Sequence, residues 1–273
     1  MNFVIQLFPM PVIIPLCVGA FAIGITLLYA SWRDLKERRV PFPTWYPMLA
    51  VALPMAVLTY LSLFSLDART TAGYLVLALV FCGVFYFSAA YLHLFGGADA
   101  WALIFITACI PLFPAEPFLG MPMLAFFPFS VLVNAVILNL ATPFGIFLWN
   151  VWKGNRAPLR YMFVGFPVEG SRIEDTFGFI MEDFYEEDGQ VRRRFIGFGE
   201  ALRRMVGGER RMYTKDLKRE PDRYASELRL YRDAGRVWIS YGIPFIIPIT
   251  AGFFSALFAG DILFELMQWI MGG

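Results

Sequence analysis

The chain has 273 residues, of which 58% are hydrophobic and only 16% are charged, whereas about a quarter of the residues in an average soluble domain are charged. This balance excludes an ordinary soluble enzyme. The net charge is +1, and no basic stripe interleaved with aromatic residues indicates nucleic-acid binding. The three cysteines form no C-x-x-C pair, so the sequence indicates neither a zinc site nor a disulfide framework, and it implies no cofactor.

Six apolar segments are candidates for membrane helices, because a helix that crosses a bilayer needs about 20 mostly apolar residues. In chain order they are Val12–Ser31, Trp45–Phe64, Ala72–Leu94, Ala100–Leu112, Pro122–Trp149 and Val237–Leu257. The fourth is short, since Asp99 precedes it and the prolines of PLFPAEP end it. We expect a membrane all-α fold of about six transmembrane helices, with a membrane domain over residues 1–152 and a last span and tail over residues 237–273.

The intervening residues 153–236 are predicted to form a small soluble α+β domain. They hold 18 of the 23 Lys and Arg residues and 15 of the 22 Asp and Glu residues. Short aromatic and β-branched runs punctuated by glycine indicate strands, with DGQ as a hairpin turn. The segment PDRYASELRLYRDAGR spaces Tyr224, Leu228 and Tyr231 three to four residues apart, which predicts an amphipathic helix.

Basic residues in short loops indicate the orientation, because Lys and Arg are enriched on the cytoplasmic side. Arg33, Lys36, Arg38 and Arg39 follow the first span, whereas the second loop has only Arg69. Counting spans alternately then places the loop with Asp99 and the polar domain on the cytoplasmic side as well. We expect a multi-pass protein of the cell membrane.

Two aspartates lie where apolar segments meet polar ones. Asp34 in SWRDLKERRVPFP ends the first span, and Asp99 in FGGADAW opens the fourth. Because two complete spans separate them, both are expected at the same membrane face. Two carboxyl groups within hydrogen-bonding reach share one proton, so one can activate a water while the other polarises a peptide carbonyl. The glycines before Asp99 would let a substrate strand or a neighbouring helix approach closely.

Each aspartate also has an ordinary structural explanation. An Asp before a helix is most often an N-cap, and DLKERR after a span is typical of a solvated basic anchor. Asn134 and Asn139 in the fifth span are expected to make interhelical hydrogen bonds.

The two motifs together resemble those of the type IV prepilin peptidase family. The run from Asp34 to Pro41 is similar to the first aspartate motif, and Gly96-Gly97-Ala98-Asp99 is similar to the G-x-G-D signature shared with presenilin-type intramembrane aspartyl proteases. Ala98 replaces the second glycine of that signature, and Phe42 stands where an amide or acid is common.

The resemblance is stronger to the archaeal preflagellin and prepilin peptidases than to bacterial members, which carry paired C-x-x-C motifs and also N-methylate the trimmed product. It implies an aspartic endopeptidase that removes a short basic leader from archaellin or pilin precursors, with these precursors and membrane lipid as partners and no nucleic acid. It implies catalytic roles for Asp34 and Asp99 and backbone support from Gly96, Gly97 and Ala98.

Three further residues are candidates for contacts to the substrate or for a helix break: Arg38, Pro41 and Pro244. Two alternatives stay open at this point. A presenilin-like protease would cut inside a transmembrane stub, and a proton-coupled transporter or scaffold would use the two acids as a proton relay.

Overall fold

The structure is a computed structural model that describes residues 9–92, 96–187, 190–206, 212–240 and 245–272. The chain divides into two compact units. One comprises Met1–Asn139 and Pro244–Gly273, and the other comprises Leu140–Ile243. We call them the membrane unit and the polar unit.

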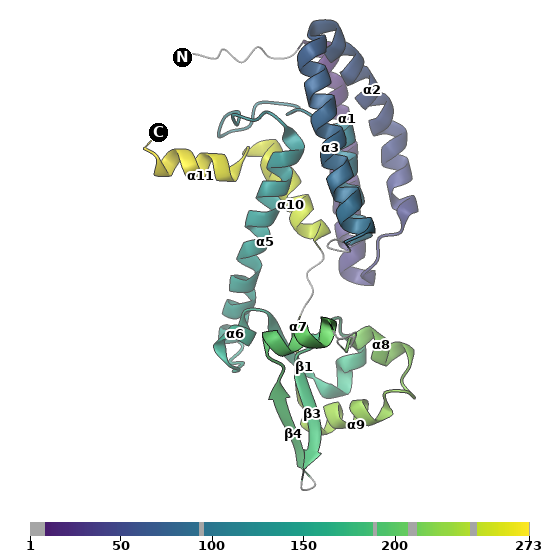
Figure 1. Cartoon of the computed structure of the whole chain (residues 1–273), viewed down its shortest axis with the longest axis vertical. Coiled ribbons are helices and arrows are strands. Elements are labelled where there is room, and N and C mark those ends of the chain that lie inside the picture. Colours follow the sequence, from purple (N-terminus) through teal and green to yellow (C-terminus); the bar gives the residue numbers. More distant parts are fainter. Residues whose placement is uncertain (1–8, 93–95, 188–189, 207–211, 241–244, 273) are drawn as a thin grey trace. The chain divides into compact units, whose positions relative to one another are not determined.

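The membrane unit is a bundle of apolar helices (Figure 1). Its elements are α1 (Met10–Glu37), η1 (Phe42–Trp45), α2 (Tyr46–Leu66), α3 (Ala68–Ala90), α4 (Gly97–Cys109), the first half of α5 (Phe127–Trp152), α10 (Ile246–Phe258) and α11 (Ile262–Ile270). Among the described residues, four helical stretches are long and apolar enough to cross a membrane, and α10 with α11 forms a pair bent by 62° that qualifies as one broken span.

Helix α4 is the exception among the predicted membrane segments. It has 13 residues, which gives a length of about 20 Å against a hydrocarbon core of about 30 Å. The predicted membrane all-α fold is confirmed. Of the six predicted segments, four or five are long enough to span, and the fourth is as short as the sequence indicated.

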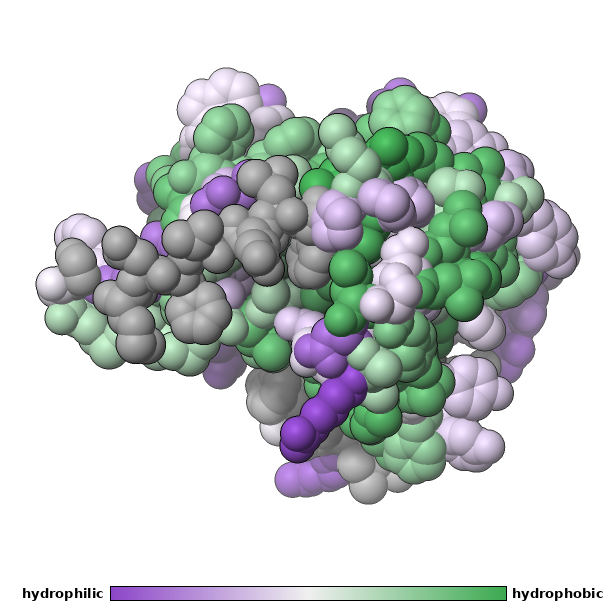
Figure 2. All heavy atoms as spheres, turned by 90° about the horizontal axis from the view of Figure 1, so that it is seen from above, coloured by the Kyte–Doolittle hydropathy of each residue, from purple (hydrophilic) through white to green (hydrophobic). Residues whose placement is uncertain are grey.

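Large apolar side chains cover much of the outside of these helices, and the face seen from above is largely hydrophobic (Figure 2). Phe21, Leu61 and Leu79 are each more than 60% exposed. Exposed apolar surface of this extent is unusual in a soluble monomer. It suits contact with lipid and supports a multi-pass membrane protein.

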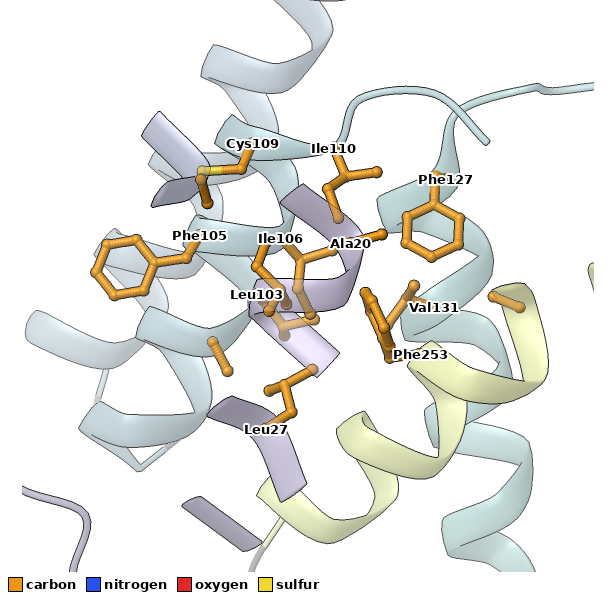
Figure 3. Packing of buried hydrophobic residues seen from close by; sticks show 14 of the residues in the cluster. Ala20, Leu27, Leu103, Phe105, Ile106, Cys109, Ile110, Phe127, Val131 and Phe253 are labelled. Atoms are coloured by element: carbon orange, nitrogen blue, oxygen red, sulfur yellow. The ribbon is translucent and has the colours of Figure 1, made fainter. Parts of the chain in front are cut away.

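The centre of the membrane unit is one buried apolar cluster, to which α1, α2, α3, α4, α5 and α10 contribute (Figure 3). Leu27 of α1 and Leu103 and Ile106 of α4 lie in one buried cluster with α5 and α10. The ring of Phe127 packs edge-on against that of Phe253, with centroids 5.4 Å apart. This packing holds α4 among the longer helices.

Helices α10 and α5 approach each other closely at Gly252. A Cβ atom added to Gly252 would lie 2.5 Å from the carbonyl oxygen of Val131 and 2.6 Å from the backbone nitrogen of Ala135. Such a distance is well inside van der Waals contact, so only glycine fits there without a backbone shift.

The bend between α10 and α11 is held by polar side chains of α5. Asn134 donates to the carbonyl of Gly260 (2.7 Å) and to Ser255 Oγ (3.0 Å), and it accepts from the backbone N–H of Ile262 (3.0 Å). Ser130 donates to the buried Asp261 (2.9 Å), which caps α11. The predicted interhelical hydrogen bonds are confirmed for Asn134, whereas Asn139 makes no side-chain hydrogen bond among the described residues.

The polar unit is a small α+β fold that begins within α5. Its elements after α5 are α6 (Leu159–Met162), β1 (Gly165–Glu169), η2 (Gly170–Asp175), β2 (Phe179–Ile180), β3 (Glu182–Glu187), β4 (Gln190–Phe195), α7 (Phe198–Val206), α8 (Thr214–Arg219), α9 (Ala225–Ala234) and β5 (Arg236–Ser240). Strand β5 lies between β1 and β2 in an antiparallel sheet, and β3 pairs with β4. The α+β prediction is confirmed.

Two local predictions in this unit have clear outcomes. Helix α9 is the predicted amphipathic helix, and Leu228 and Tyr231 lie in its buried face. The antiparallel pairing of Glu187 with Gln190 is that of a hairpin, but residues 188–189 of the predicted turn lie outside the described residues.

The predicted start of the last span is wrong. Val237, Trp238 and Ile239, which we expected to open it, lie in β5 and are buried in the sheet. The described helix begins at Ile246. A short apolar run cannot be assigned to a strand or a helix by hydropathy alone, and here it is continuous in sequence with a genuine membrane segment.

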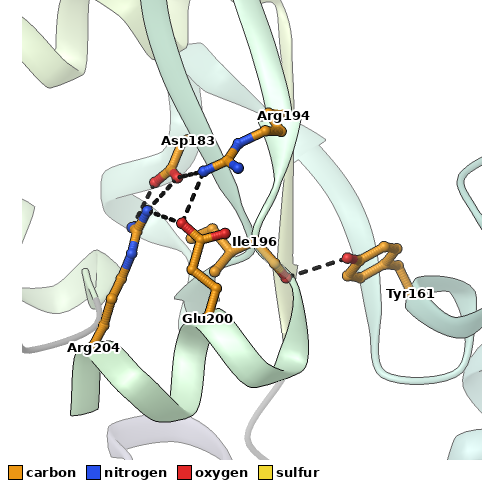
Figure 4. A network of polar contacts seen from close by, with 6 residues as sticks. All are labelled: Tyr161, Asp183, Arg194, Ile196, Glu200 and Arg204. Atoms are coloured by element: carbon orange, nitrogen blue, oxygen red, sulfur yellow. Dashed lines mark hydrogen bonds and ion pairs between the residues drawn. The ribbon is translucent and has the colours of Figure 1, made fainter. Parts of the chain in front are cut away.

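Charged side chains of the polar unit form an ion-pair network (Figure 4). Arg204 contacts Asp183 and Glu200, each at 2.6 Å, and Arg194 contacts the same two carboxylates at 3.3 and 2.8 Å. Hydrogen bonds from Arg204 are the main cause that lowers the pKa of Asp183 and of Glu200. The network joins α7 to β3 and β4.

Candidate active site

Asp34 lies in the last turn of α1. The helix ends after Glu37 because Arg38 adopts a left-handed conformation with φ of 53°, and its backbone N–H donates to the carbonyl of Asp34 (2.9 Å). Such a conformation is uncommon outside glycine. The Asp34 side chain is half-buried, and the charge of Arg38 acts on it. Asp34 therefore lies where α1 turns into the connection to α2.

Asp99 lies in the first turn of α4. Gly96 is the N-cap, so Asp99 occupies the third helical position, and its side chain accepts a hydrogen bond from the backbone N–H of Gly96. This is the acidic half of a capping box. The capping role that the sequence suggested for Asp99 is therefore confirmed in part. Asp99 caps the start of α4 from the third helical position and not as the N-cap residue, which is Gly96.

A second helix also contributes to the surroundings of Asp99. The backbone N–H of Ile246, the first residue of α10, lies close enough to the Asp99 side chain to act on it. Both donors belong to helix starts, where backbone N–H groups have no partner within the helix and the helix dipole favours negative charge. Sequence analysis did not find Ile246, because its contribution comes from the backbone and no side-chain pattern marks it.

The two aspartates lie within electrostatic reach of each other, although 65 positions separate them in the sequence. Their carboxyl groups are close enough for the charge of Asp34 to act on Asp99. Helices α1, α4 and α10 contact one another pairwise, and this common packing brings the two side chains to one end of the bundle. A pair of carboxyl groups is the chemical feature that the site offers.

The glycines before Asp99 differ in what they permit. A Cβ atom added to Gly96 would lie 2.8 Å from Oδ2 of Asp99, whereas one added to Gly97 would meet no described atom within 4 Å. Gly96 therefore leaves room for the carboxylate to fold back on the helix start. Gly97 and the half-buried Ala98 form the first turn of α4 without such a contact.

Aromatic packing joins the segment after Asp34 to the helix of Asp99. Pro41 is extended and precedes η1. The ring of Phe42 packs edge-on against Trp101 and Phe105 of α4, with centroid distances of 5.2 and 6.2 Å. Phe42, which departs from the family motif, here fixes the position of this segment through packing and not through a polar contact.

The remaining candidates are placed as follows. Pro244 lies outside the described residues. Within the described ranges, no three or more His, Cys, Asp or Glu side chains are grouped as a metal site would require.

Comparisons with known proteins cover both units. The sequence pattern of the type IV leader peptidase family matches residues 21–148, which include both aspartates. The pattern described as archaeal peptidase A24 C-terminus type II matches residues 157–262, which include the polar unit's sheet and the start of α10. Together the two matches cover most of the chain.

Similar full-length proteins carry the same name in three methanogens. The chain is 25% identical to a preflagellin peptidase of Methanococcus voltae over 262 residues, which cover 91% of this chain and 98% of that protein. It is 25% identical to one of Methanocaldococcus jannaschii over 266 residues (92% and 98%) and 20% identical to one of Methanococcus maripaludis over 252 residues (89% and 96%). The chain is thus a membrane peptidase that belongs to the type IV leader peptidase family.

Proposed function

We propose that this peptidase removes the short basic leader of preflagellin-like and type IV pilin-like precursors, and that Asp34 and Asp99 carry out the hydrolysis as a pair. The observation that carries the proposal is the position of both aspartates near the ends of the packed helices α1 and α4, where the two carboxyl groups are within electrostatic reach of each other. The similarity to preflagellin peptidases over nine-tenths of the chain supports the substrate class.

The chemistry needs one ionised and one protonated carboxyl group, which a close pair favours. The ionised member takes a proton from water as the water oxygen attacks the scissile carbonyl carbon. The protonated member donates to the carbonyl oxygen. When the tetrahedral intermediate collapses, the C–N bond breaks and the leaving nitrogen takes up a proton. The products are a leader with a new carboxylate and a mature protein with a free amino terminus.

The position of the pair favours cleavage at the membrane boundary. Asp34 lies four residues before Arg38, where α1 ends, and Asp99 lies in the first turn of α4. Both are near helix ends and not at mid-helix. This position suits cleavage of a peptide bond just before the apolar helix of a precursor. It suits less well the cleavage of a bond inside a transmembrane stub, which a presenilin-like protease would carry out.

The basic residues around Asp34 favour the cytoplasmic face. Arg33, Lys36, Arg38 and Arg39 surround the end of α1, and basic short loops are typical of that side. Counting spans alternately from this loop predicts that the polar unit is cytoplasmic as well.

Cleavage of a precursor with a short basic leader tests the proposal. Purified membranes with the wild type, Asp34→Asn or Asp99→Asn are incubated with the precursor, and mass spectrometry maps any cut. We expect the wild type to cut at the leader boundary and either substitution to reduce the rate at least about a hundredfold, the lower end of general acid–base contributions.

Asp67→Asn is the matched control. Asp67 is also an acid in the membrane unit, but it caps α3 through the backbone N–H groups of Arg69 and Thr70, and asparagine caps equally well. It should retain full activity. A cut inside the apolar helix would favour the presenilin-like alternative. Intact precursor with folded wild type, or unchanged cleavage by both Asp→Asn variants, would contradict the proposal.

A further inference from the structure

Two buried hydroxyl groups join α1 to α10 close to the aspartates. Ser31 Oγ of α1 and Thr250 Oγ1 of α10 are 2.7 Å apart, and their side chains are nearly inaccessible. Thr250 Oγ1 also lies 2.8 Å from the carbonyl of Ile246 and 3.3 Å from that of Leu27. Their interaction crosses between helices, whereas the other buried threonines of the membrane unit, Thr59, Thr71 and Thr107, each donate to the carbonyl four residues earlier.

The number of available protons fixes the direction of these hydrogen bonds. Each hydroxyl has one proton to donate. Both short contacts are satisfied when Ser31 donates to Thr250 and Thr250 donates to the carbonyl of Ile246. The alternative, in which Thr250 donates to Ser31, leaves Ser31 only a 3.5 Å contact to that carbonyl. The first arrangement makes a continuous chain from α1 to the start of α10.

This chain ends at the residue that contacts Asp99. The carbonyl of Ile246 accepts from Thr250, and the backbone N–H of the same residue lies close enough to Asp99 to act on it. On the other side, Ser31 precedes Asp34 by three residues, so both lie on one face of α1. The hydrogen bonds of Ser31 and Thr250 therefore connect the helix of one aspartate to a residue beside the other.

We propose that Ser31 and Thr250 are positioning residues that hold the start of α10 on α1, so that the Ile246 N–H orients Asp99 toward Asp34. The inference rests on the proposed function, because it assigns these residues to the same reaction. They do not touch the substrate. Their effect reaches the reaction through the geometry of Asp99, so it falls on turnover and not on substrate binding.

Thr250→Val tests the inference, because valine keeps the shape and removes the hydroxyl. We expect kcat for precursor cleavage to fall about tenfold or more, as small misplacements of catalytic groups do, with KM within about twofold of the wild type. Thr250→Ser restores the hydroxyl and should recover most of kcat. Thr59→Val is the matched control, since it removes an equally buried hydroxyl whose bond stays within α2.

Hydrogen exchange gives a readout that does not depend on activity. The amides at the start of α10 should exchange faster in Thr250→Val than in the wild type or in Thr59→Val, as measured by mass spectrometry of peptides from that region. If Thr250→Val fails to fold, Ser31→Ala serves instead, with a smaller loss of kcat because Thr250 keeps its bond to Ile246.

The possible failures are distinguishable. Wild-type protein that does not cleave any short-leader precursor contradicts the proposed function, and the exchange measurement still tests the positioning role. Wild-type cleavage with unchanged kcat in Thr250→Val, and in Ser31→Ala, overturns the inference alone. Loss of activity that Thr250→Ser does not recover, or equal loss in Thr59→Val, also overturns it.

Discussion

Several polar side chains of the membrane unit are buried and join one helix to another, whereas the ion pairs of the polar unit are mostly exposed. Asn134 is fully buried and makes three hydrogen bonds at the bend between α10 and α11. In the polar unit, Arg194 and Arg229 form ion pairs with more than half of their side-chain surface still exposed.

This difference predicts where substitutions matter. A buried polar group that loses its partner costs about 1–3 kcal/mol, whereas an exposed ion pair contributes about 0–1 kcal/mol. The membrane unit should therefore respond strongly to single changes at contact points, and the polar unit weakly. The aspartates lie in the unit where position is fixed by close packing, which suits a site that needs exact geometry.

The largest effect is expected from Gly252→Ala. The new methyl group would overlap the backbone of Val131 and Ala135, and overpacking of this kind costs about 1–3 kcal/mol or more. Thermal unfolding in detergent should show a clear loss of stability. Gly83→Ala in α3 is the control, because its added Cβ meets no described atom within 4 Å. Equal melting temperatures for the two variants would contradict the packing between α5 and α10.

Asn134→Leu should have the next largest effect. It removes the partners of the Gly260 carbonyl and of the Ile262 N–H. Interhelical hydrogen bonds in membranes contribute about 0.6 kcal/mol each on average and at most about 1.7, so we expect a loss of about 1–3 kcal/mol in the free energy of unfolding. Protease accessibility of α11 should rise. An unchanged digestion pattern would show that the bend does not depend on Asn134.

Acid should weaken the polar unit through Asp183 and Glu200. Hydrogen bonds from Arg204 lower the pKa of both groups. Their stabilising contribution is therefore present above their unfolded pKa values of about 4 and is lost as the pH falls through the lower folded values. Intrinsic fluorescence of Trp238 during acid titration, with the other tryptophans replaced by phenylalanine, would follow this unit.

Glu182 has the opposite effect on the stability of the polar unit in acid. Burial raises its pKa, so its protonation on acidification favours the folded state and partly offsets the loss. Glu182→Gln should therefore make the acid transition of the polar unit steeper. A transition that is insensitive to both Glu182→Gln and Arg204→Met would contradict the assignment of these carboxylates.

The smallest effect is expected from Arg204→Met at neutral pH. It breaks the ion pairs with Asp183 and Glu200, but these side chains are about 30% exposed, so we expect a loss of about 1 kcal/mol or less. Arg203→Met changes the exposed neighbouring residue and serves as the control. A loss as large as that of Gly252→Ala would contradict the contrast between the two units.

The sequence predicted more of the fold than of the site's surroundings. Apolar runs and charge distribution were enough for the membrane helices, the short α4 and the α+β character of the polar unit. The start of the last span was predicted wrongly. The apolar residues Val237–Ile239 pack in the sheet as part of β5, but in the sequence they stand shortly before a membrane helix, so the two apolar runs looked like one.

At the site, the positions of Asp34 and Asp99 followed from counting spans. The contacts around them did not follow. Ile246 acts through its backbone N–H, and Phe42 packs on Trp101 through a tertiary contact that no local pattern indicates. The two aspartates could be recognised in the sequence because the proposed chemistry requires carboxyl groups at these positions. Ile246 and Phe42 could not be recognised, because many residue types can supply a backbone N–H or an apolar packing contact.

Cross-linking of the two aspartate positions tests the pairing most directly. Asp34→Cys and Asp99→Cys are combined in a chain whose three native cysteines are replaced by serine, and a short bifunctional thiol reagent is applied to membranes. Asp34→Cys with Asp67→Cys is the control. Helix α2 has 21 residues, so it places Asp67 about 30 Å from Asp34. Asp67 lies at the other end of the bundle, where Ser62 contacts Pro11. We predict a linked peptide for the first pair and none for the control. Absence of the link in the first pair, with both cysteines reactive, would contradict the account.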